Sequence, residues 1–256
     1  MEVQSVTKSS EKTAVLIYGH PGVGKTRLAG TGNKTLILRP PTDHTDSIRN
    51  PEVNEIVIRD WHKMDEVYQW LREEKGAGYE WVWFDSVSLW QDIGLDDIWE
   101  DVIAEKPHRK RYGLDKGDYG INMQRLSRWI RHMVMLCKDH GYFNFGVTAH
   151  AAETLDPDDN MLYMPYVQGQ NMSNKFCGYM NIVAYYEIVK KDGKNFRVLR
   201  SQATDQYYAK DQYDAFPDGR LVDPTIPKIV AAIDKVRHSD KPSQSKNTRS
   251  RKNARS

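Results

Sequence analysis

Cysteine is scarce in this chain of 256 residues: it occurs only as Cys137 and Cys177, which form no C-x-x-C pair. A disulfide framework or a cysteine-ligated metal site is therefore not expected, and the scarcity is typical of a reducing compartment. No apolar run approaches the roughly 20 residues that a membrane-spanning helix needs. Residues 1–13 form a polar lead-in without the apolar core of a signal peptide. We therefore expect a soluble protein of the cytoplasm with no membrane partner.

The net charge of +2 hides an uneven distribution of charged residues. Residues 241–256 contain six basic side chains and no acidic one, whereas the other 240 residues carry 31 basic and 35 acidic groups. This polar tail lacks aromatic residues and cannot bury a core, so we expect it to be disordered. It is either an electrostatic tether to nucleic acid or a solubilising tail without a specific partner.

The central feature of the sequence is the stretch at 19–26, which matches the pattern G-x-x-x-x-G-K-T in full. Its residues are Gly19, His20, Pro21, Gly22, Val23, Gly24, Lys25 and Thr26. An apolar run at 14–18 precedes it and residues that can open a helix follow it, which is the context of a phosphate-binding loop. Backbone N–H groups in such a loop, together with the positive end of the helix, favour a phosphate group. The alternative is a glycine-rich turn that carries an exposed lysine.

Two positions are candidates for binding the charges of a nucleoside triphosphate, which we take to be ATP. Lys25 is expected to reach the β- and γ-phosphates, and the Thr26 hydroxyl to bind Mg²⁺. Asp85 follows an apolar run at 81–84 that is typical of a strand buried on both faces. Ligands of open α/β sheets lie at the carboxyl ends of strands, so Asp85 is the candidate carboxylate for the same Mg²⁺. The alternative for Asp85 is the N-cap of the following helix.

Hydrophobic periodicity and turn signals predict the remaining elements. We expect strands at 35–38, 55–58 and 142–148, with His150 just past the end of the last, and helices at 63–73, 89–104, 121–139 and 227–237. Residues 182–189 and 196–199 flank a turn-forming stretch and predict a β-hairpin. Residues 151–169 are expected to be a long connection. The chain then divides into the lead-in at 1–13, one α/β domain at 14–238 and the tail at 239–256.

The order of these elements resembles the RecA-like ATPase core over about residues 14–234, with the sharpest matches at 19–26, 85–86, 146–150 and 209–211. More closely, the chain resembles the phage-encoded AAA-type nucleotide-binding proteins that act as RecA-like single-strand annealing proteins. The resemblance implies a mostly parallel central sheet flanked by helices, to which the C-terminal β-hairpin and the basic tail are added. It also implies ATP hydrolysis, single-stranded DNA as a partner, annealing or strand exchange, and assembly into a ring or filament. A single-strand binding protein is a further candidate partner, and the location would be the cytoplasm of a bacterial host.

One position of the family pattern is different in this chain. In RecA-like proteins a glutamate after the second strand activates the attacking water, and the corresponding stretch at 39–46 contains no glutamate. Asp43 and Asp46 are the candidate substitutes, although an aspartate is one methylene shorter. His150 falls where the family places a polar sensor of the γ-phosphate; the alternative is an ordinary loop histidine.

The resemblance also assigns a residue that would act across a subunit interface. Lys210 matches a cation that RecA-like assemblies place against the γ-phosphate held by the next subunit. Gln212 stands where related sequences often carry an arginine. The alternative is that Lys210 is a surface lysine paired with Asp211 or Asp214.

Two segments, at 106–118 and 151–171, match the DNA-binding loops of the family. The candidate contacts, cations for phosphates and aromatic rings for stacking on bases, are Arg109, Lys110, Arg111, Tyr163 and Tyr166. The alternatives are a solvated charged loop for the cations and core packing for the tyrosines. Two other functions stay open: a P-loop kinase for a nucleotide or other small molecule, and a non-catalytic, nucleotide-gated assembly protein.

Overall fold

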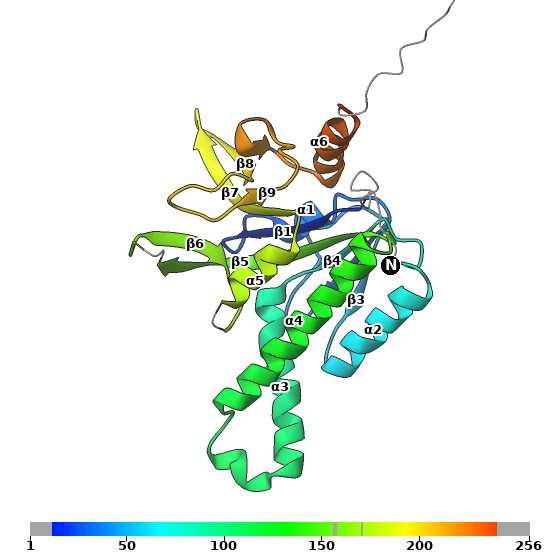
Figure 1. The fold of residues 1–256 in the computed structure, drawn as a ribbon, viewed down its shortest axis with the longest axis vertical. Coiled ribbons are helices and arrows are strands. Elements are labelled where there is room, and N and C mark those ends of the chain that lie inside the picture. Colours follow the sequence, from blue (N-terminus) through cyan, green and yellow to red (C-terminus); the bar gives the residue numbers. More distant parts are fainter. Residues whose placement is uncertain (1–11, 156–157, 170, 240–256) are drawn as a thin grey trace, which may run out of the picture.

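The computed structural model describes residues 12–155, 158–169 and 171–239 (Figure 1). The strands in these ranges are β1 (Ala14–Gly19), β2 (Thr35–Arg39), β3 (Val53–Val57), β4 (Trp81–Phe84), β5 (Asn144–Leu155), β6 (Met161–Pro165), β7 (Ile182–Lys191), β8 (Lys194–Arg200), β9 (Lys210–Asp211) and β10 (Arg220–Val222). The helices are α1 (Lys25–Ala29), α2 (Trp61–Glu73), α3 (Val87–Glu105), α4 (Lys116–Lys138), α5 (Met172–Tyr179) and α6 (Ile226–Ser239), with short 3-10 turns η2 (Pro107–Arg111) and η3 (Pro217–Gly219). The expected α/β class is confirmed.

The strands form one mixed sheet in the order β10-β8-β7-β1-β5-β4-β2-β3, with β6 on β5 and β9 on β7. The six strands from β7 to β3 in this order are parallel, whereas β8, β10, β6 and β9 pair in antiparallel fashion. Parallel strands share one carboxyl edge, so the loops that follow β1, β2 and β4 come together there. At this edge Gly19 of β1 lies opposite His150 of β5.

Helices cover both faces of the sheet, and the alternation of side chains along each strand fills two cores. Along β4, Val82 and Phe84 pack into the core under α2, α3, α4 and α5. Trp81 and Trp83 of the same strand pack into the opposite core, with α1 and α6. Figure 1 shows this layering, with α6 on one side of the sheet and α2, α3 and α4 on the other. The long apolar runs of the sequence are therefore strands buried on both faces.

Two hairpins project from this body (Figure 1). The first is an antiparallel helical arm made of α3, η2 and α4. The second is the ladder of β5 and β6, in which Ala151 pairs with Pro165 and Leu155 with Met161. The prediction of a long connection at 151–169 was therefore wrong, because residues 151–155 and 161–165 pair with each other as an antiparallel hairpin.

Other boundaries moved for local reasons. The helix expected at 121–139 begins at Lys116, because Asp115 and Asp118 form a capping box one turn earlier. The predicted C-terminal β-hairpin is confirmed as β7 and β8, joined at Asp192 and Gly193, both with positive φ. Elements α5, β9 and β10 were not predicted.

The lead-in at 1–11 and the tail at 240–256 lie outside the described residues, so the division into 1–13, 14–238 and 239–256 stays a prediction. Within the described ranges, every helix is too short or too polar to span a lipid bilayer.

Candidate nucleotide-binding site

The loop between β1 and α1 has the backbone of an anion-binding turn. Gly22 and Gly24 have φ angles of +82° and +102°, a region that residues with a Cβ rarely adopt. Gly24 is the N-cap of α1, and its carbonyl accepts the hydrogen bond of the Leu28 N–H at 2.9 Å. The motif is thus folded as the strand–loop–helix unit that its sequence predicts.

Lys25 is buried beneath this loop. Its Nζ donates to the carbonyl oxygens of Gly19 and His20, at 3.0 and 3.1 Å. Burial lowers the pKa of the Lys25 ammonium, whereas the carboxylates of Asp85 and Asp43 act to raise it. A buried cation between a loop that favours phosphate and two carboxylates fits the charge compensation that a triphosphate needs. The alternative of an exposed lysine on a glycine-rich turn was wrong.

Asp85 is buried at the carboxyl end of β4, and its carboxylate accepts a hydrogen bond from the Thr148 hydroxyl. The Thr26 hydroxyl lies close enough to act on the pKa of the same carboxyl, which it lowers. Burial raises the pKa of this carboxyl, and the nearby Asp43 raises it further. The N-cap of α3 is Ser86, whose Oγ accepts from the Leu89 N–H at 3.4 Å. The alternative role of Asp85 as the cap was therefore wrong.

These groups also fit a magnesium ion. The Thr26 hydroxyl and the Asp85 carboxylate lie within hydrogen-bonding reach of each other, and hard oxygen ligands of this kind suit Mg²⁺. A divalent cation would favour the ionised form of Asp85, which burial alone disfavours. The described residues contain no group of three or more His, Cys, Asp or Glu side chains placed to bind a metal ion. Oxygens from outside the protein would therefore complete the coordination of a Mg²⁺ ion bound by Thr26 and Asp85. Phosphate oxygens and water commonly do so for Mg²⁺.

The loop after β2 brings Asp43 to the same place. Arg39 binds Glu55 of β3 through two hydrogen bonds, and its Nη1 donates to the Asp43 carbonyl at 2.9 Å. Glu55 also accepts from the Thr45 hydroxyl, so both ends of the turn are attached to β3. Burial raises the pKa of the Asp43 carboxyl above its ordinary value. The aspartate is thereby a stronger base than an exposed one, as the substitute for the missing glutamate would need to be.

His150 lies within β5 rather than past the end of the strand, since β5 continues to Leu155. The backbone N–H of His150 donates to the Ser88 Oγ at 2.9 Å, and the Ser88 hydroxyl in turn donates to the Tyr166 carbonyl at 2.8 Å. Burial lowers the pKa of the imidazole, and Lys25 lowers it further. The ring is thus neutral at pH 7 and retains one N–H donor.

These residues line one cleft of about 520 Å³. Its lining is Pro21, Gly22, Gly24, Lys25, Thr26, Arg27, Asp43, His44, Asp46, Ser47, Asp85, Ser86, His150 and Arg197. The structure therefore brings together the loop motif and four sequence-predicted partners: Asp43, Asp46, Asp85 and His150. Arg197 was missed: it lies in the second strand of the hairpin, and no local motif marks it.

Lys210 lies elsewhere, in a second cavity of about 320 Å³ with Asp211 and Asp214. Its Nζ donates to the Cys177 carbonyl at 3.0 Å, and it forms no ion pair with a described residue. Burial lowers the pKa of its ammonium. The alternative of a lysine paired with a neighbouring aspartate was wrong, whereas the role across an interface stays a prediction.

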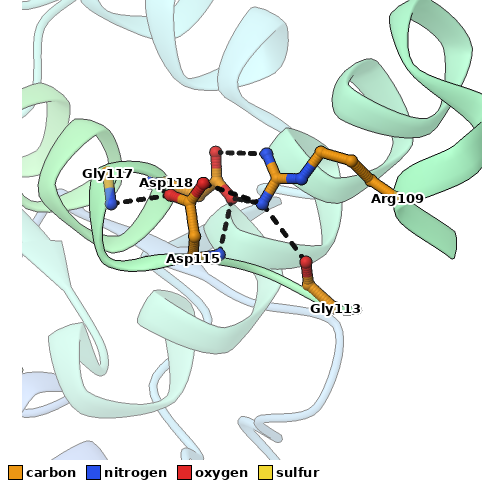
Figure 2. A network of polar contacts seen from close by, with 5 residues as sticks. All are labelled: Arg109, Gly113, Asp115, Gly117 and Asp118. Atoms are coloured by element: carbon orange, nitrogen blue, oxygen red, sulfur yellow. Dashed lines mark hydrogen bonds and ion pairs between the residues drawn. The ribbon is translucent and has the colours of Figure 1, made fainter. Parts of the chain in front are cut away.

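The basic segment occupies the end of the helical arm. Figure 2 shows that Arg109 is held inside this turn: its Nη2 lies 2.8 Å from Asp118, 3.0 Å from Asp115 and 3.2 Å from the Gly113 carbonyl. Lys110 and Arg111 are exposed. The candidate contacts therefore separate into one cation that closes the turn and two that are free to meet a phosphate.

The two tyrosine candidates also separate. The Tyr163 ring stacks on Tyr185 with 5.8 Å between centroids and lies edge-on to His20 of the phosphate-binding loop at 5.2 Å. Core packing thus describes Tyr163 better than a free stacking platform. Tyr166 is 44% exposed and remains available to a partner.

A protein-family model described as an AAA domain matches residues 11–213. No curated protein matches the sequence.

Among the solved structures that are similar to this chain are three at low identity. The RadB recombinase is 13% identical, with 84% of this chain and 87% of that chain covered and a TM-score of 0.47. The KaiC-like protein PH0186 from Pyrococcus horikoshii OT3 is 13% identical, with 84% and 90% covered and a TM-score of 0.42. The ATPase domain of G40P is 12% identical, with 86% and 84% covered and a TM-score of 0.49.

The family match spans most of the chain and includes the phosphate-binding loop, Asp43, Asp85 and His150, which the fold brings into one cleft. The chain belongs to the AAA domain family of P-loop ATPases.

Proposed function

We propose that this protein is an ATP-dependent, RecA-like recombination protein that binds single-stranded DNA and promotes annealing or strand exchange. The observation that carries the proposal is the course of β5. The strand supplies Thr148 to Asp85 and His150 to the cleft, and then continues into the projecting ladder with β6. A change at the nucleotide would thus reach a segment that is expected to contact DNA.

The residues of the cleft would divide the work of hydrolysis. Lys25 and the backbone of the loop would offset phosphate charge, and Thr26 and Asp85 would hold Mg²⁺, which would supply further positive charge near the phosphates. Asp43 orients and deprotonates the attacking water. The neutral His150 donates its N–H toward the γ-phosphate.

The DNA contacts would come from exposed groups at the end of the helical arm and directly after β6. Lys110 and Arg111 at the end of the helical arm offer cations to phosphates, and Tyr166 offers a ring to a base. We further propose assembly into a ring or filament in the cytoplasm of a bacterial host, as for phage-encoded annealing proteins, with a single-strand binding protein as a candidate partner.

A second candidate is a nucleotide-gated assembly protein that barely hydrolyses ATP. It is favoured by the absence of a glutamate among the described residues that line the cleft. A P-loop kinase is the third, with a small acceptor in place of DNA.

Phosphate release by the full chain, with and without oligo(dT), separates these functions. The proposal expects turnover that rises several-fold with DNA and annealing of complementary strands that depends on ATP. Turnover that needs a small acceptor would identify a kinase, and negligible turnover with intact ATP binding would identify an assembly protein. Lys25→Ala is the inactive reference, and Lys63→Ala, a lysine of α2 whose side chain is 45% exposed and pairs with Glu66, is the matched control.

A further inference from the structure

A second cation reaches the phosphate-binding loop from a distant strand. Arg197 of β8 donates from its Nε to the Val23 carbonyl at 3.0 Å. Its side chain crosses Gly24 so closely that a Cβ at position 24 would lie 3.0 Å from this Nε. Position 24 therefore needs glycine both for its positive φ and for the room that Arg197 occupies. The contact joins the β7–β8 hairpin directly to the loop.

The backbone of Arg197 is fixed from the other side. Its N–H donates to the Asp223 carboxylate at 3.1 Å, and its carbonyl accepts from the Asp223 N–H at 2.7 Å. Lys228 of α6 donates to the Asp223 carbonyl at 2.7 Å. These hydrogen bonds fix the position of the Arg197 backbone, and therefore the direction from which its side chain approaches the loop.

Most of the Arg197 guanidinium is not used by the protein. Among the described residues, no carboxylate lies within 4.0 Å of it, and its two Nη groups donate to no protein atom. Arg197 nevertheless lines the same cleft as Lys25 and Thr26. A guanidinium presents its donors as a planar fork that matches two phosphate oxygens. An unpaired fork beside an anion-binding loop is placed for an anion in that cleft.

The order of the sheet says which part of the nucleotide it meets. Asp85 and Asp43 follow β4 and β2, and His150 lies within β5; these three strands are all on one side of β1, whereas β7 and β8 lie on the other side. The γ-phosphate and Mg²⁺ belong with the carboxylates. Arg197 therefore lies on the side of the loop away from the reacting phosphate.

We propose that Arg197 is a nucleotide-binding residue, supplied by the same chain, whose guanidinium contacts the α- and β-phosphates while its Nε braces the loop. The inference rests on nucleotide binding by this cleft and adds a residue to it. ATP and ADP share these phosphates, so both depend on Arg197 equally.

Two substitutions separate phosphate contact from bracing alone. Arg197→Gln keeps an N–H donor for the Val23 carbonyl but removes the positive charge, whereas Arg197→Lys keeps the charge. Arg220→Met, an exposed arginine on the adjoining β10, is the control. Calorimetric titration with MgATP and with MgADP measures the affinities. Hydrogen exchange of residues 19–26 without nucleotide reports whether the loop is intact.

For Arg197→Gln we expect affinity for MgATP and MgADP to fall equally, by about tenfold, as for loss of a charge-assisted hydrogen bond. Arg197→Lys keeps the charge but loses the planar fork, so its affinities should lie between those of wild type and Arg197→Gln. Equal affinities of the Gln and Lys variants would mean bracing alone and would overturn the proposal. A loss confined to MgATP would place Arg197 at the γ-phosphate and overturn it as well. A wild-type chain that binds neither nucleotide would instead refute the proposed function.

Discussion

Arg39 and Glu55 form a bidentate ion pair beside the cleft, with 2.9 Å between Nε and Oε2 and 2.7 Å between Nη2 and Oε1. The pair joins β2 to β3 at the base of the turn that carries Asp43. Among the described residues, the Asp43 carboxylate accepts one hydrogen bond, from the His44 N–H, and forms no ion pair. The position of the candidate base is thus set by an ion pair that does not itself line the cleft.

Glu55→Gln should therefore slow turnover without changing MgATP affinity. The neutral side chain binds Arg39 less strongly, so the turn loosens and Asp43 spends less time in place; we expect a loss of about three- to tenfold in kcat. Steady-state phosphate release and equilibrium titration give the two quantities. Glu52→Gln, an exposed neighbour, is the control. An equal loss in affinity and kcat would mean that the pair supports the whole site rather than Asp43.

The same pair gives a pH dependence of stability. The Arg39 guanidinium lowers the pKa of Glu55 to about 2, below the ordinary 4.5. The ion pair thus adds stability above pH 4.5, and this contribution is lost as the pH falls toward 2. The free energy of unfolding, measured by denaturation, should be higher for wild type than for Glu55→Gln at neutral pH, and the two values should converge as the pH falls toward 2. A constant difference between the two would exclude ionisation of Glu55 as its origin.

Lys25→Ala should abolish tight ATP binding. The backbone of the loop alone leaves the charge of the β- and γ-phosphates poorly compensated, so we expect affinity to fall by about a hundredfold or more. Titration with a fluorescent ATP analogue measures this loss, and Lys34→Ala, an exposed lysine, serves as the control. Unchanged affinity would remove the assignment of the phosphate-binding loop.

Asp85→Asn should raise the stability of the nucleotide-free protein while removing the Mg²⁺ dependence of ATP binding. Burial raises the pKa of Asp85 above the ordinary 3.8. The folded protein is therefore most stable when Asp85 is neutral, and it loses this stability as the pH rises through the raised pKa and the carboxyl ionises. Asparagine stays neutral, and each kcal/mol recovered at pH 7 raises Tm by about 2–4 °C. Thermal unfolding without nucleotide and titration with and without Mg²⁺ measure both effects. Intact Mg²⁺ dependence in the variant would show that Asp85 does not hold the metal.

Arg109→Ala and Lys110→Ala should behave differently. Arg109 closes the end of the helical arm through Asp115, Asp118 and Gly113, so its loss should open this turn and speed hydrogen exchange at 106–120 by about tenfold. Lys110 is exposed, and its loss should leave exchange unchanged while weakening DNA binding and its salt dependence. Both variants should bind DNA more weakly, whether the lost side chain contacts DNA or supports the turn. Hydrogen exchange is therefore the measurement that distinguishes the two roles. Equal exchange in the two variants would contradict a structural role for Arg109.

What could be predicted from the sequence was local. The loop motif and Asp85 are each read from a few contiguous residues, and the fold placed both where the motif requires. Arg197 could not be predicted, since it reaches Val23 across 174 positions of sequence through the pairing of β7 with β1. The cap of α3 was ambiguous for another reason. Aspartate and serine both cap helices; in the fold Ser86 caps α3, and Asp85 turns inward to the hydroxyl of Thr148 on the neighbouring strand.

The unbroken course of β5 restricts how the chain can change in length. Thr148 and His150 lie two positions apart and so project from the same face of the strand, one toward Asp85 and one into the cleft. One residue inserted between them would turn His150 and everything beyond it to the opposite face, including the half of the strand that pairs with β6. An insertion between Leu155 and Met161 would leave Thr148 and His150 untouched. Tags or extra turn residues can therefore be inserted between Leu155 and Met161 without changing the face on which Thr148 and His150 lie.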